Sequence, residues 1–293
     1  MRPNNLKTKI FLDSGNPVET REALKLLGFL DGQTTNPSLI AKNPELQAKI
    51  SAGQKLGSEE INAFYKSVVE EIQVMIPEGS ISIEVYADKN TTKEKMIEQA
   101  REMNKWIPNA HIKLPITEEG LLAEHDLLKE GIRINMTLCF SQEQAGAVYN
   151  MSKGSNKGDV FLSPFIGRLD DKRQNGMSLI ENIQKVYEKG DGHVEILAAS
   201  IRSYEHFLAC LALGVDIVTA PLKILEEWWK RDLELPENFV YDKKDLSNIF
   251  LEDVSLDKNF IDYNLQHDLT DTGLEKFVSD WNMLITHLPV SKN

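Results

Sequence analysis

The chain has 293 residues, of which 41% are hydrophobic and 27% are charged. This composition is ordinary for a globular protein and allows one large or two modest domains with a sizeable core. The 33 Lys and Arg residues against 45 Asp and Glu residues give a net charge of −12, which argues against nucleic acid and anionic membrane as partners. Any anion that the protein binds must therefore be held by a local cluster of donors.

The two cysteines, Cys139 and Cys210, lie in separate apolar runs. This placement predicts buried thiols rather than a disulfide framework, and it favours a reducing cytoplasm. The first residues, MRPNNLKTKIFLD, lack the apolar core of a signal peptide. No run of about 18 apolar residues is present to span a membrane. We therefore expect a soluble, cytoplasmic protein without a membrane partner.

Short apolar or β-branched runs alternate with helical stretches along the chain. The runs cover residues 9–13, 32–38, 80–87, 110–116, 132–140, 159–167, 194–200 and 216–222. The helical stretches cover residues 17–30, 62–76, 92–106, 117–130, 141–152, 178–189 and 203–214. Several of them begin at a Ser or Thr that suits the N-cap position, namely Thr92, Thr117, Ser141 and Ser203.

This alternation is typical of βαβ units and a parallel sheet. Eight repeats favour an α/β fold of the (β/α)8 TIM-barrel type, although a doubly wound open sheet would give a similar pattern. We expect residues 1–293 to form one barrel domain, with a helical insertion near 41–60 and a C-terminal extension over 231–293. Within the extension, residues 231–270 are polar and aromatic, and Phe277, Trp281 and Leu284 predict one face of an amphipathic helix.

Lys113 lies in an apolar run, between Ile112 and Leu114 and followed by Pro115 and Ile116. Burial would disfavour the charged form of this lysine and lower its pKa. A neutral amine can attack a carbonyl, and the resulting iminium can accept the electrons of a neighbouring C–C bond as that bond breaks. The alternative is a lysine at a strand end that reaches solvent, and this run alone does not decide between them.

Polar residues also occur near the ends of all but one of the predicted strands. In a barrel the C-terminal strand ends converge on one mouth, where enzymes of this architecture place their active sites. Any one of these residues could be a satisfied buried polar group or a helix cap, but their recurrence favours a site. They are Asp13, Thr34, Thr35, Asn36, Glu84, Lys113, Asn135, Thr137, Ser163, Arg168, Ser200 and Arg202.

Seven segments, in order between residues 9 and 222, resemble the signature blocks of the transaldolase family. They are FLD, DGQTTNPSLI, EVYA, IKLPIT, INMTLCFS, LSPFIGR and AASIR. TTNPSLI and SPFIGR are the most specific, and the later GLEKFVSDW resembles the last helix of the family. The resemblance implies a class I, Schiff-base aldolase of the transaldolase and fructose-6-phosphate aldolase group. We expect no metal and no cofactor, because the iminium does the electrophilic work.

The resemblance also implies catalytic roles. Lys113 matches the lysine that forms the iminium, and Asp13 matches the acid/base that handles the proton of the ketose C4 hydroxyl. Glu84 matches the acid that relays protons, with a water held near Thr137, as the carbinolamine forms and dehydrates.

Substrate-binding roles follow in the same way. The positions that would contact the sugar are Thr34, Asn36 and Asn135, the last of which would bind the dihydroxyacetone hydroxyls. The positions that would bind phosphate are Ser163, Arg168, Ser200 and Arg202, because Arg offers a fixed fork of donors and Ser adds short neutral ones. Arg202 could instead be a solvated charge at a helix start, and Arg168 could pair with Asp170 or Asp171.

The implied reaction is the transfer of a dihydroxyacetone unit from sedoheptulose 7-phosphate or fructose 6-phosphate to an aldose phosphate, in the pentose phosphate pathway. A fructose-6-phosphate aldolase, which releases free dihydroxyacetone, is the alternative. That subgroup is expected to carry a tyrosine where this chain has Phe165, so Phe165 together with Glu84 favours transfer. A transaldolase for a sulfonated or otherwise altered sugar, and a non-catalytic barrel, also stay open, as does assembly into a homo-oligomer.

Two features depart from the expected family pattern. Tyr86 lies two residues after Glu84, where a smaller or more polar residue is expected, and LDDKRQNG follows in place of an aromatic-containing continuation after the SPFIGR block. Both would be able to change the acceptor specificity.

Overall fold

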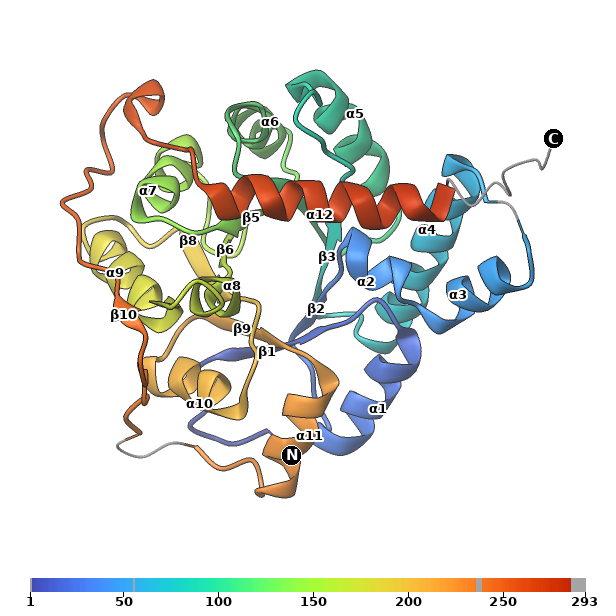
Figure 1. Ribbon diagram of the computed structural model, residues 1–293, viewed down its shortest axis with the longest axis horizontal. Helices are drawn as coiled ribbons and strands as arrows, with labels where there is room; N and C mark the ends of the chain where they lie inside the picture. Colours follow the sequence, from blue (N-terminus) through green and yellow to red (C-terminus); the bar gives the residue numbers. More distant parts are fainter. Residues whose placement is uncertain (1, 55, 236–238, 286–293) are drawn as a thin grey trace.

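The computed structural model describes residues 2–54, 56–235 and 239–285. Eight parallel strands hydrogen-bond in the order β1-β2-β3-β4-β5-β6-β8-β9, and β1 pairs with β9 to close the barrel (Figure 1). The closed (β/α)8 barrel is therefore confirmed over the open sheet. Its strands are β1 (Lys9–Asp13), β2 (Gly32–Thr34), β3 (Ser80–Glu84), β4 (Ala110–Pro115), β5 (Ile134–Cys139), β6 (Val160–Pro164), β8 (Val194–Ala198) and β9 (Ile217–Ala220).

Helices follow the strands and cover the outside of the barrel. They include α1 (Pro17–Leu27), α4 (Ser58–Met75), α5 (Lys93–Met103), α6 (Glu118–Lys129), α7 (Gln142–Met151), α9 (Gly176–Tyr187), α10 (Tyr204–Leu213) and α11 (Leu222–Lys230). The predicted N-caps Thr117, Ser141 and Ser203 each accept a hydrogen bond from a first-turn amide. Thr92 holds the N-cap position of α5 without such a bond.

Two short helices follow β2. The first is α2 (Pro37–Ala41), and the second is α3 (Pro44–Ser51), which lies in the 41–60 region. Each of them has proline at its first position and an asparagine side chain as its N-cap.

The sixth predicted strand, 159–167, extends too far. Strand β6 ends at Pro164, and the chain then forms α8 (Ile166–Asp170), so that Arg168 lies on a helix. The apolar run continues past the end of the strand, so the sequence does not mark this turn. The backbone turns where a tertiary contact forms, in which the Gly167 amide donates to the Ser200 carbonyl at 3.1 Å. A two-residue strand, β7 (Gln174–Asn175), follows, and it pairs with β10 (Ser247–Asn248).

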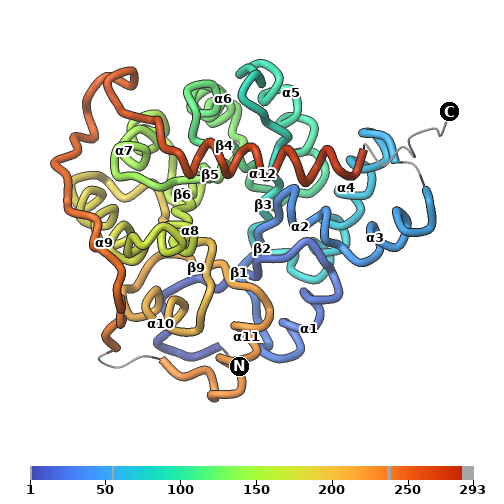
Figure 2. Tube along the Cα trace, in the orientation of Figure 1, coloured from blue at the N-terminus to red at the C-terminus, as the bar shows by residue number. Residues whose placement is uncertain are grey.

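Residues 239–267, here called the strap, run along the outside of α7 and α9 (Figure 2). The described part of the strap has only β10 and the 3-10 helix η1 (Phe260–Asp262) as regular structure. Side-chain amides on the two helices bind its backbone instead, which meets its need for hydrogen-bond partners. The amides of Gln142, Gln144, Asn150 and Asn182 donate to the carbonyls of Phe250, Leu265, Leu256 and Ile249, at 2.8 to 2.9 Å.

The last described helix, α12 (Asp268–Ile285), lies across the C-terminal mouth of the barrel (Figure 1). Phe277, Trp281 and Leu284 are buried beneath it, as predicted. The helix is fixed at its start because the Thr270 hydroxyl donates to the Leu138 carbonyl at 3.0 Å. Leu138 has a φ of 63° at an irregularity in β5, a conformation that is strained for a bulky residue. Within the predicted C-terminal extension, residues 236–238 and 286–293 lie outside the described residues.

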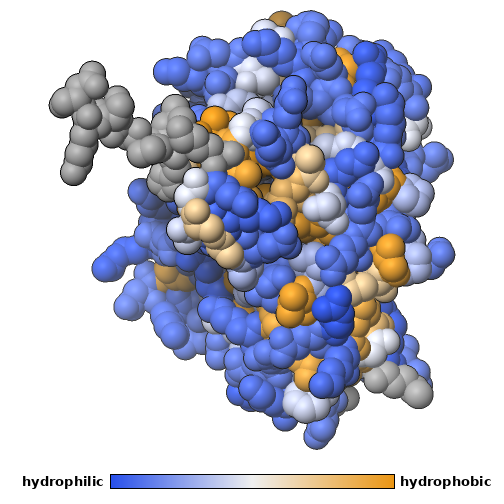
Figure 3. Space-filling view, turned by 90° about the vertical axis from the view of Figure 1, so that its right-hand side faces the viewer, coloured by the Kyte–Doolittle hydropathy of each residue, from blue (hydrophilic) through white to orange (hydrophobic). Residues whose placement is uncertain are grey.

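The character of the surface and the burial of the two cysteines are those expected from the sequence. Figure 3 shows a largely hydrophilic face on which hydrophobic residues form scattered patches. None of the described helices combines the length and the apolar character that crossing a membrane requires. Cys139 and Cys210 are buried free thiols, as predicted, and burial raises the pKa of Cys139 to about 12.

Candidate active site

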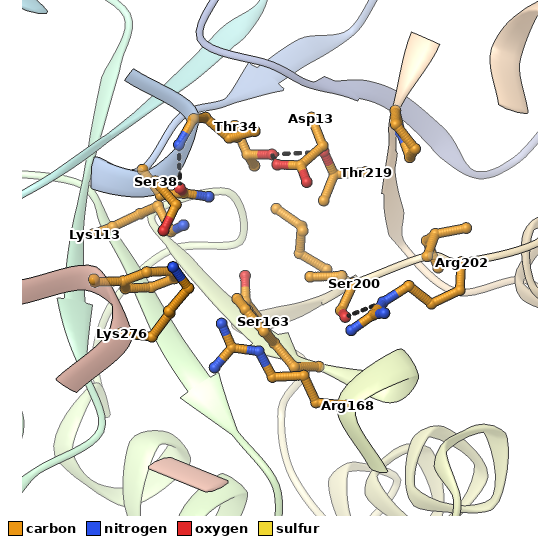
Figure 4. Close-up of a pocket in the computed structure, with 18 of the residues that line it drawn as sticks. Asp13, Thr34, Ser38, Lys113, Ser163, Arg168, Ser200, Arg202, Thr219 and Lys276 are labelled. Atoms are coloured by element: carbon orange, nitrogen blue, oxygen red, sulfur yellow. Dashed lines mark hydrogen bonds between the residues drawn. The ribbon is translucent and has the colours of Figure 1, made fainter. Parts of the chain in front are cut away.

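A pocket of about 370 Å³ opens at the C-terminal ends of the strands, next to α12 (Figure 4). Its size is within the range of small-ligand sites, and its place is where barrel enzymes bind their substrates. The sequence predicts a catalytic or binding role for eleven residues and a part in substrate choice for Phe165. Nine of these twelve line the pocket: Asp13, Thr34, Asn36, Lys113, Ser163, Phe165, Arg168, Ser200 and Arg202. The other three, Glu84, Asn135 and Thr137, lie behind this lining.

Lys113 is brought to the pocket by β4 and does not reach bulk solvent. Its side chain is only 3% exposed, and Nζ lies 2.9 Å from Oε2 of Glu84. The two residues are direct neighbours in the β3–β4 register. Nζ also donates to the Thr35 carbonyl at 3.3 Å. Burial raises the pKa of Glu84, although Lys113 opposes this shift, and a carboxyl group with a perturbed pKa beside an amine is a candidate for proton transfer.

Asp13 ends β1 at another edge of the pocket, next to Thr34 and Thr219 (Figure 4). The Thr34 hydroxyl donates to Oδ1 of Asp13 at 2.7 Å and lies 2.6 Å from the Thr219 hydroxyl. Since the Thr34 proton is directed to Asp13, Thr219 donates to Thr34. Burial raises the pKa of Asp13, while the Thr34 hydrogen bond and the charge of Lys113 lower it. Asp13 is therefore a candidate acid/base within the pocket.

A buried polar network supports the floor of the pocket. Asn135 is fully buried, its Nδ2 donates to the Ser82 hydroxyl at 3.0 Å, and its Oδ1 accepts from the Ser163 hydroxyl at 2.7 Å. The Thr137 hydroxyl is also buried and has no hydrogen-bond partner among the described residues. Asn36 uses its Oδ1 to cap α2 at the Leu39 amide, and the rest of its side chain faces the pocket.

The two predicted arginines lie in different surroundings. The Arg168 guanidinium lies between the rings of Phe165 and Phe277, at 5.3 and 5.4 Å from their centroids. Burial and the nearby Arg202 lower the pKa of Arg168. Asp171 pairs with Arg202 at 3.0 Å rather than with Arg168, and this pair is exposed to solvent. Exposed pairs contribute little to stability, so an anionic ligand can replace Asp171 at Arg202.

Ser200 and Gly167 set the spacing of this cationic cluster. Ser200 has a φ of 60°, in the left-handed region that L residues other than Asn and Asp rarely adopt. Its hydroxyl accepts from Nε of Arg202 at 3.3 Å. A Cβ atom at position 167 would lie 2.3 Å from the Ser200 carbonyl oxygen, so only glycine permits this approach between α8 and the loop after β8.

Sequence reasoning missed part of the pocket lining. The additional polar residues are Ser38, Lys42, Thr219, Lys223, Lys276 and Asp280, and Phe277 had been predicted only as a packing residue. On α12, the Asp280 carboxylate pairs with Lys276 and accepts from the Ser38 hydroxyl. Thr219 lies in the predicted eighth strand and could have been found from its place near the strand end. The α12 residues gave no such signal, because amphipathicity does not show which surface a helix covers.

Tyr86, which departs from the expected pattern, faces α12. Its hydroxyl accepts from Nδ2 of Asn282 at 3.4 Å, and it does not belong to the pocket lining.

The pocket concentrates positive charge within an acidic protein. Six lysine and arginine residues line it, Lys42, Lys113, Arg168, Lys223, Lys276 and Arg202, against the carboxyl groups of Asp13 and Asp280. The local donor cluster expected from the net charge of −12 is present here. Over the described part of the chain, no group of three or more His, Cys, Asp or Glu residues is arranged to hold a metal ion.

Comparison with known proteins identifies the family. The model of the family described as Transaldolase/Fructose-6-phosphate aldolase matches residues 10–288. The chain belongs to this family. A "Probable transaldolase" of Dehalococcoides mccartyi is 36% identical over 273 residues, which cover 93% of this chain and 97% of that protein. A "Probable transaldolase" of Caldicellulosiruptor saccharolyticus is 37% identical over 274 residues, with coverage of 93% and 96%.

Membership in the transaldolase/fructose-6-phosphate aldolase family makes the chain an enzyme of the aldolase and transaldolase type. Sugar phosphates are the substrates that fit this family, and a pocket with hydroxyls, a buried amine and two arginines suits their chemistry.

Proposed function

We propose that the protein is a transaldolase. It transfers a dihydroxyacetone unit reversibly from a ketose phosphate, sedoheptulose 7-phosphate or fructose 6-phosphate, to an aldose phosphate through a Schiff base on Lys113. The observation that carries this proposal is the buried amine of Lys113 beside Glu84, in a pocket that also holds Asp13 and an arginine cluster. The proposal places the enzyme in the pentose phosphate pathway of the cytoplasm.

In the first step, Nζ of Lys113 attacks the C2 carbonyl of the ketose. The carbinolamine then loses water and becomes an iminium. Glu84, 2.9 Å from Nζ, takes the proton that the amine releases and returns it to the departing hydroxyl. The Thr137 hydroxyl has no hydrogen-bond partner within residues 2–54, 56–235 and 239–285, which supports the role of holding a water for this relay.

In the second step, Asp13 removes the proton of the C4 hydroxyl. The C3–C4 bond breaks, its electron pair enters the iminium to form an enamine, and the aldose phosphate leaves. The enamine carbon then attacks a second aldehyde, Asp13 returns its proton to the new hydroxyl, and water releases the ketose from Lys113. The raised pKa of Asp13 supports this role, because a base with a pKa closer to neutrality also returns a proton readily.

The phosphate is bound by Ser163, Arg168, Ser200 and Arg202. All four line the pocket (Figure 4), and the exposed Asp171 is the group that the phosphate displaces from Arg202. The same donors would accept a sulfonate, so a sulfonated sugar is included among the substrates to be tested.

Phe165 favours transfer over release of dihydroxyacetone. A tyrosine hydroxyl is expected at this position in the fructose-6-phosphate aldolase subgroup. Here an apolar ring lines the pocket and packs edge-on against Phe140, with centroids 6.0 Å apart.

Borohydride trapping with fructose 6-phosphate tests the Schiff base. Mass spectrometry is expected to find a dihydroxyacetone-derived adduct on Lys113, and no adduct in Lys113→Ala. Lys223→Ala, which removes another lysine of the pocket lining, is the matched control and should keep the adduct. If no ketose phosphate and no sulfonated ketose gives an adduct, the enzymatic proposal fails.

A second assay separates transfer from release. With fructose 6-phosphate as donor, turnover of a transaldolase requires erythrose 4-phosphate as acceptor. Formation of free dihydroxyacetone at the same rate without an acceptor would show a fructose-6-phosphate aldolase instead.

A further inference from the structure

A cluster of three side chains lies behind the arginines of the pocket. His206 is buried at the start of α10, and its Nε2 lies 2.7 Å from Oδ2 of Asp170 on α8 and 2.8 Å from the hydroxyl of Tyr241 on the strap. The Tyr241 hydroxyl is also within 3.3 Å of Oδ2 of Asp170. Three segments that are distant in the sequence therefore meet at one imidazole.

The hydrogen bonds of His206 indicate which ring nitrogen carries the proton. Nδ1 of His206 accepts from the backbone amide of Arg202 at 3.3 Å. In a neutral ring the proton is then on Nε2, which donates to Asp170 and Tyr241, while the Tyr241 hydroxyl donates to Asp170. Burial raises the pKa of Asp170, but the hydrogen bonds from His206 and from the Gly176 amide outweigh it and leave the pKa below its ordinary value.

This cluster connects both arginines of the pocket to the strap. Asp170 is two residues beyond Arg168 on the same short helix, and the imidazole holds the amide of Arg202. The strap end that carries Tyr241 is itself fixed, because Ser247 of β10 donates its amide to the Arg173 carbonyl at 2.9 Å.

We infer that Tyr241, His206 and Asp170 form a brace that positions Arg202 and Arg168 for an anionic substrate, so that the strap serves substrate binding. This inference rests on the proposed function for the identity of the anion, a sugar phosphate. The three side chains are positioning residues: none of them belongs to the pocket lining.

The brace predicts a specific pattern of kinetic change. Tyr241→Phe removes the hydroxyl, and His206→Asn keeps an acceptor near the Arg202 amide but removes the donor to Asp170. Each variant should raise KM for the phosphorylated substrate by roughly three- to tenfold, the effect of one lost hydrogen bond, with little change in kcat. The KM of the double variant should be no higher than the higher KM of the two single variants, because both substitutions break the same connection between the strap and the arginines.

Hydrogen exchange supplies a readout that does not depend on the substrate. In the full-length protein, peptides that cover residues 199–206 should exchange faster in Tyr241→Phe and in His206→Asn than in the unchanged chain. Tyr263→Phe is the matched control. It removes a hydroxyl that donates to the Ser255 carbonyl at 2.8 Å elsewhere on the strap, and it should change neither exchange at 199–206 nor KM.

The outcomes separate the two proposals. Exchange at 199–206 that is unchanged in both brace variants would overturn the brace, whatever the activity. Additive effects of the two substitutions on KM would also overturn it, because independent sites add. If the unchanged chain turns over no sugar phosphate, the proposed function fails, and the exchange result still decides whether Tyr241 holds the Arg202 loop.

Discussion

Asp13 and Glu84 are two carboxyl groups in one site with different surroundings. Asp13 accepts from a threonine hydroxyl that is itself the acceptor of another hydroxyl, while Glu84 lies against the amine of Lys113. Burial raises both pKa values. In the proposed mechanism, these different partners let the two acids take separate proton transfers: Glu84 serves the amine and Asp13 serves the sugar hydroxyl.

Thr34→Val tests the control of Asp13. The substitution removes the hydroxyl that stabilises the ionised carboxylate, so the pKa of Asp13 should rise further. Asp13 must be ionised to take the C4 proton, and activity should therefore be lost at a higher pH during acidification. We expect the acid limb of the kcat/KM profile to move up by roughly one pH unit. Steady-state assays across the acid limb measure this shift.

Thr20→Val is the matched control for this substitution. The Thr20 hydroxyl is also buried, but it donates to Gln33 at 2.8 Å and does not contact Asp13. Its acid limb should stay in place. An acid limb in Thr34→Val that coincides with that of the unchanged chain would show that Asp13 does not set it.

At the scale of elements, the strap shows how an irregular segment is held on a helical surface. Gln142 is fully buried on α7, and it both donates to the Phe250 carbonyl and accepts from the Glu252 amide at 3.0 Å. One side chain thus replaces two partners that a neighbouring strand would supply.

Gln142→Met keeps the shape of this side chain but removes both hydrogen bonds. Because the strap backbone can reach water once released, we expect a loss of about 1 kcal/mol in the free energy of unfolding. Urea denaturation measures it. Gln54→Met, at an exposed position, is the control and should leave the denaturation midpoint unchanged. Equal midpoints for the two variants would mean that the amide does not hold the strap.

Strands and capped helices were predictable because their signals are local. The alternation of apolar runs with helical stretches, and caps such as Ser141, depend on neighbours within one element. Helix α8 was not predictable: residues 160–167 are apolar enough to continue a strand, and the turn depends on the distant Ser200. The same holds for the candidate site. Its residues at strand ends were predictable, because strand ends converge in any barrel, whereas Lys276 reaches the pocket only through the packing of α12.

At the scale of the whole molecule, Glu124 links stability to pH. It is fully buried on α6, and neither carboxylate oxygen has a hydrogen-bond partner among the described residues. Burial raises its pKa well above the ordinary value of 4.5. The folded protein therefore binds this proton more tightly than the unfolded chain, and this contribution to stability is complete below the unfolded pKa and is lost as pH rises toward the folded one.

Glu124→Gln removes the ionisable group with little change in shape. The variant should match the unchanged chain in mildly acidic solution and become more stable than it as pH rises, by about 1.4 kcal/mol per pH unit between the two pKa values. Urea denaturation over a range of pH checks this. Glu78→Gln, at an exposed position, should not show the trend. Parallel curves for Glu124→Gln and the unchanged chain would contradict it.

The position of α12 across the mouth has a consequence for biosynthesis. Asp13, Lys276 and Asp280 all line the pocket, so the first and the last of its lining residues are separated by almost the whole described chain. At about 5–20 residues per second, a ribosome needs more than ten seconds between making the two. The barrel strands, which end at Ala220, can pair while the later residues are still in the ribosome. A nascent chain would thus hold Lys113 in an uncovered mouth, and the enclosed pocket would form only after the strap and α12 have been released.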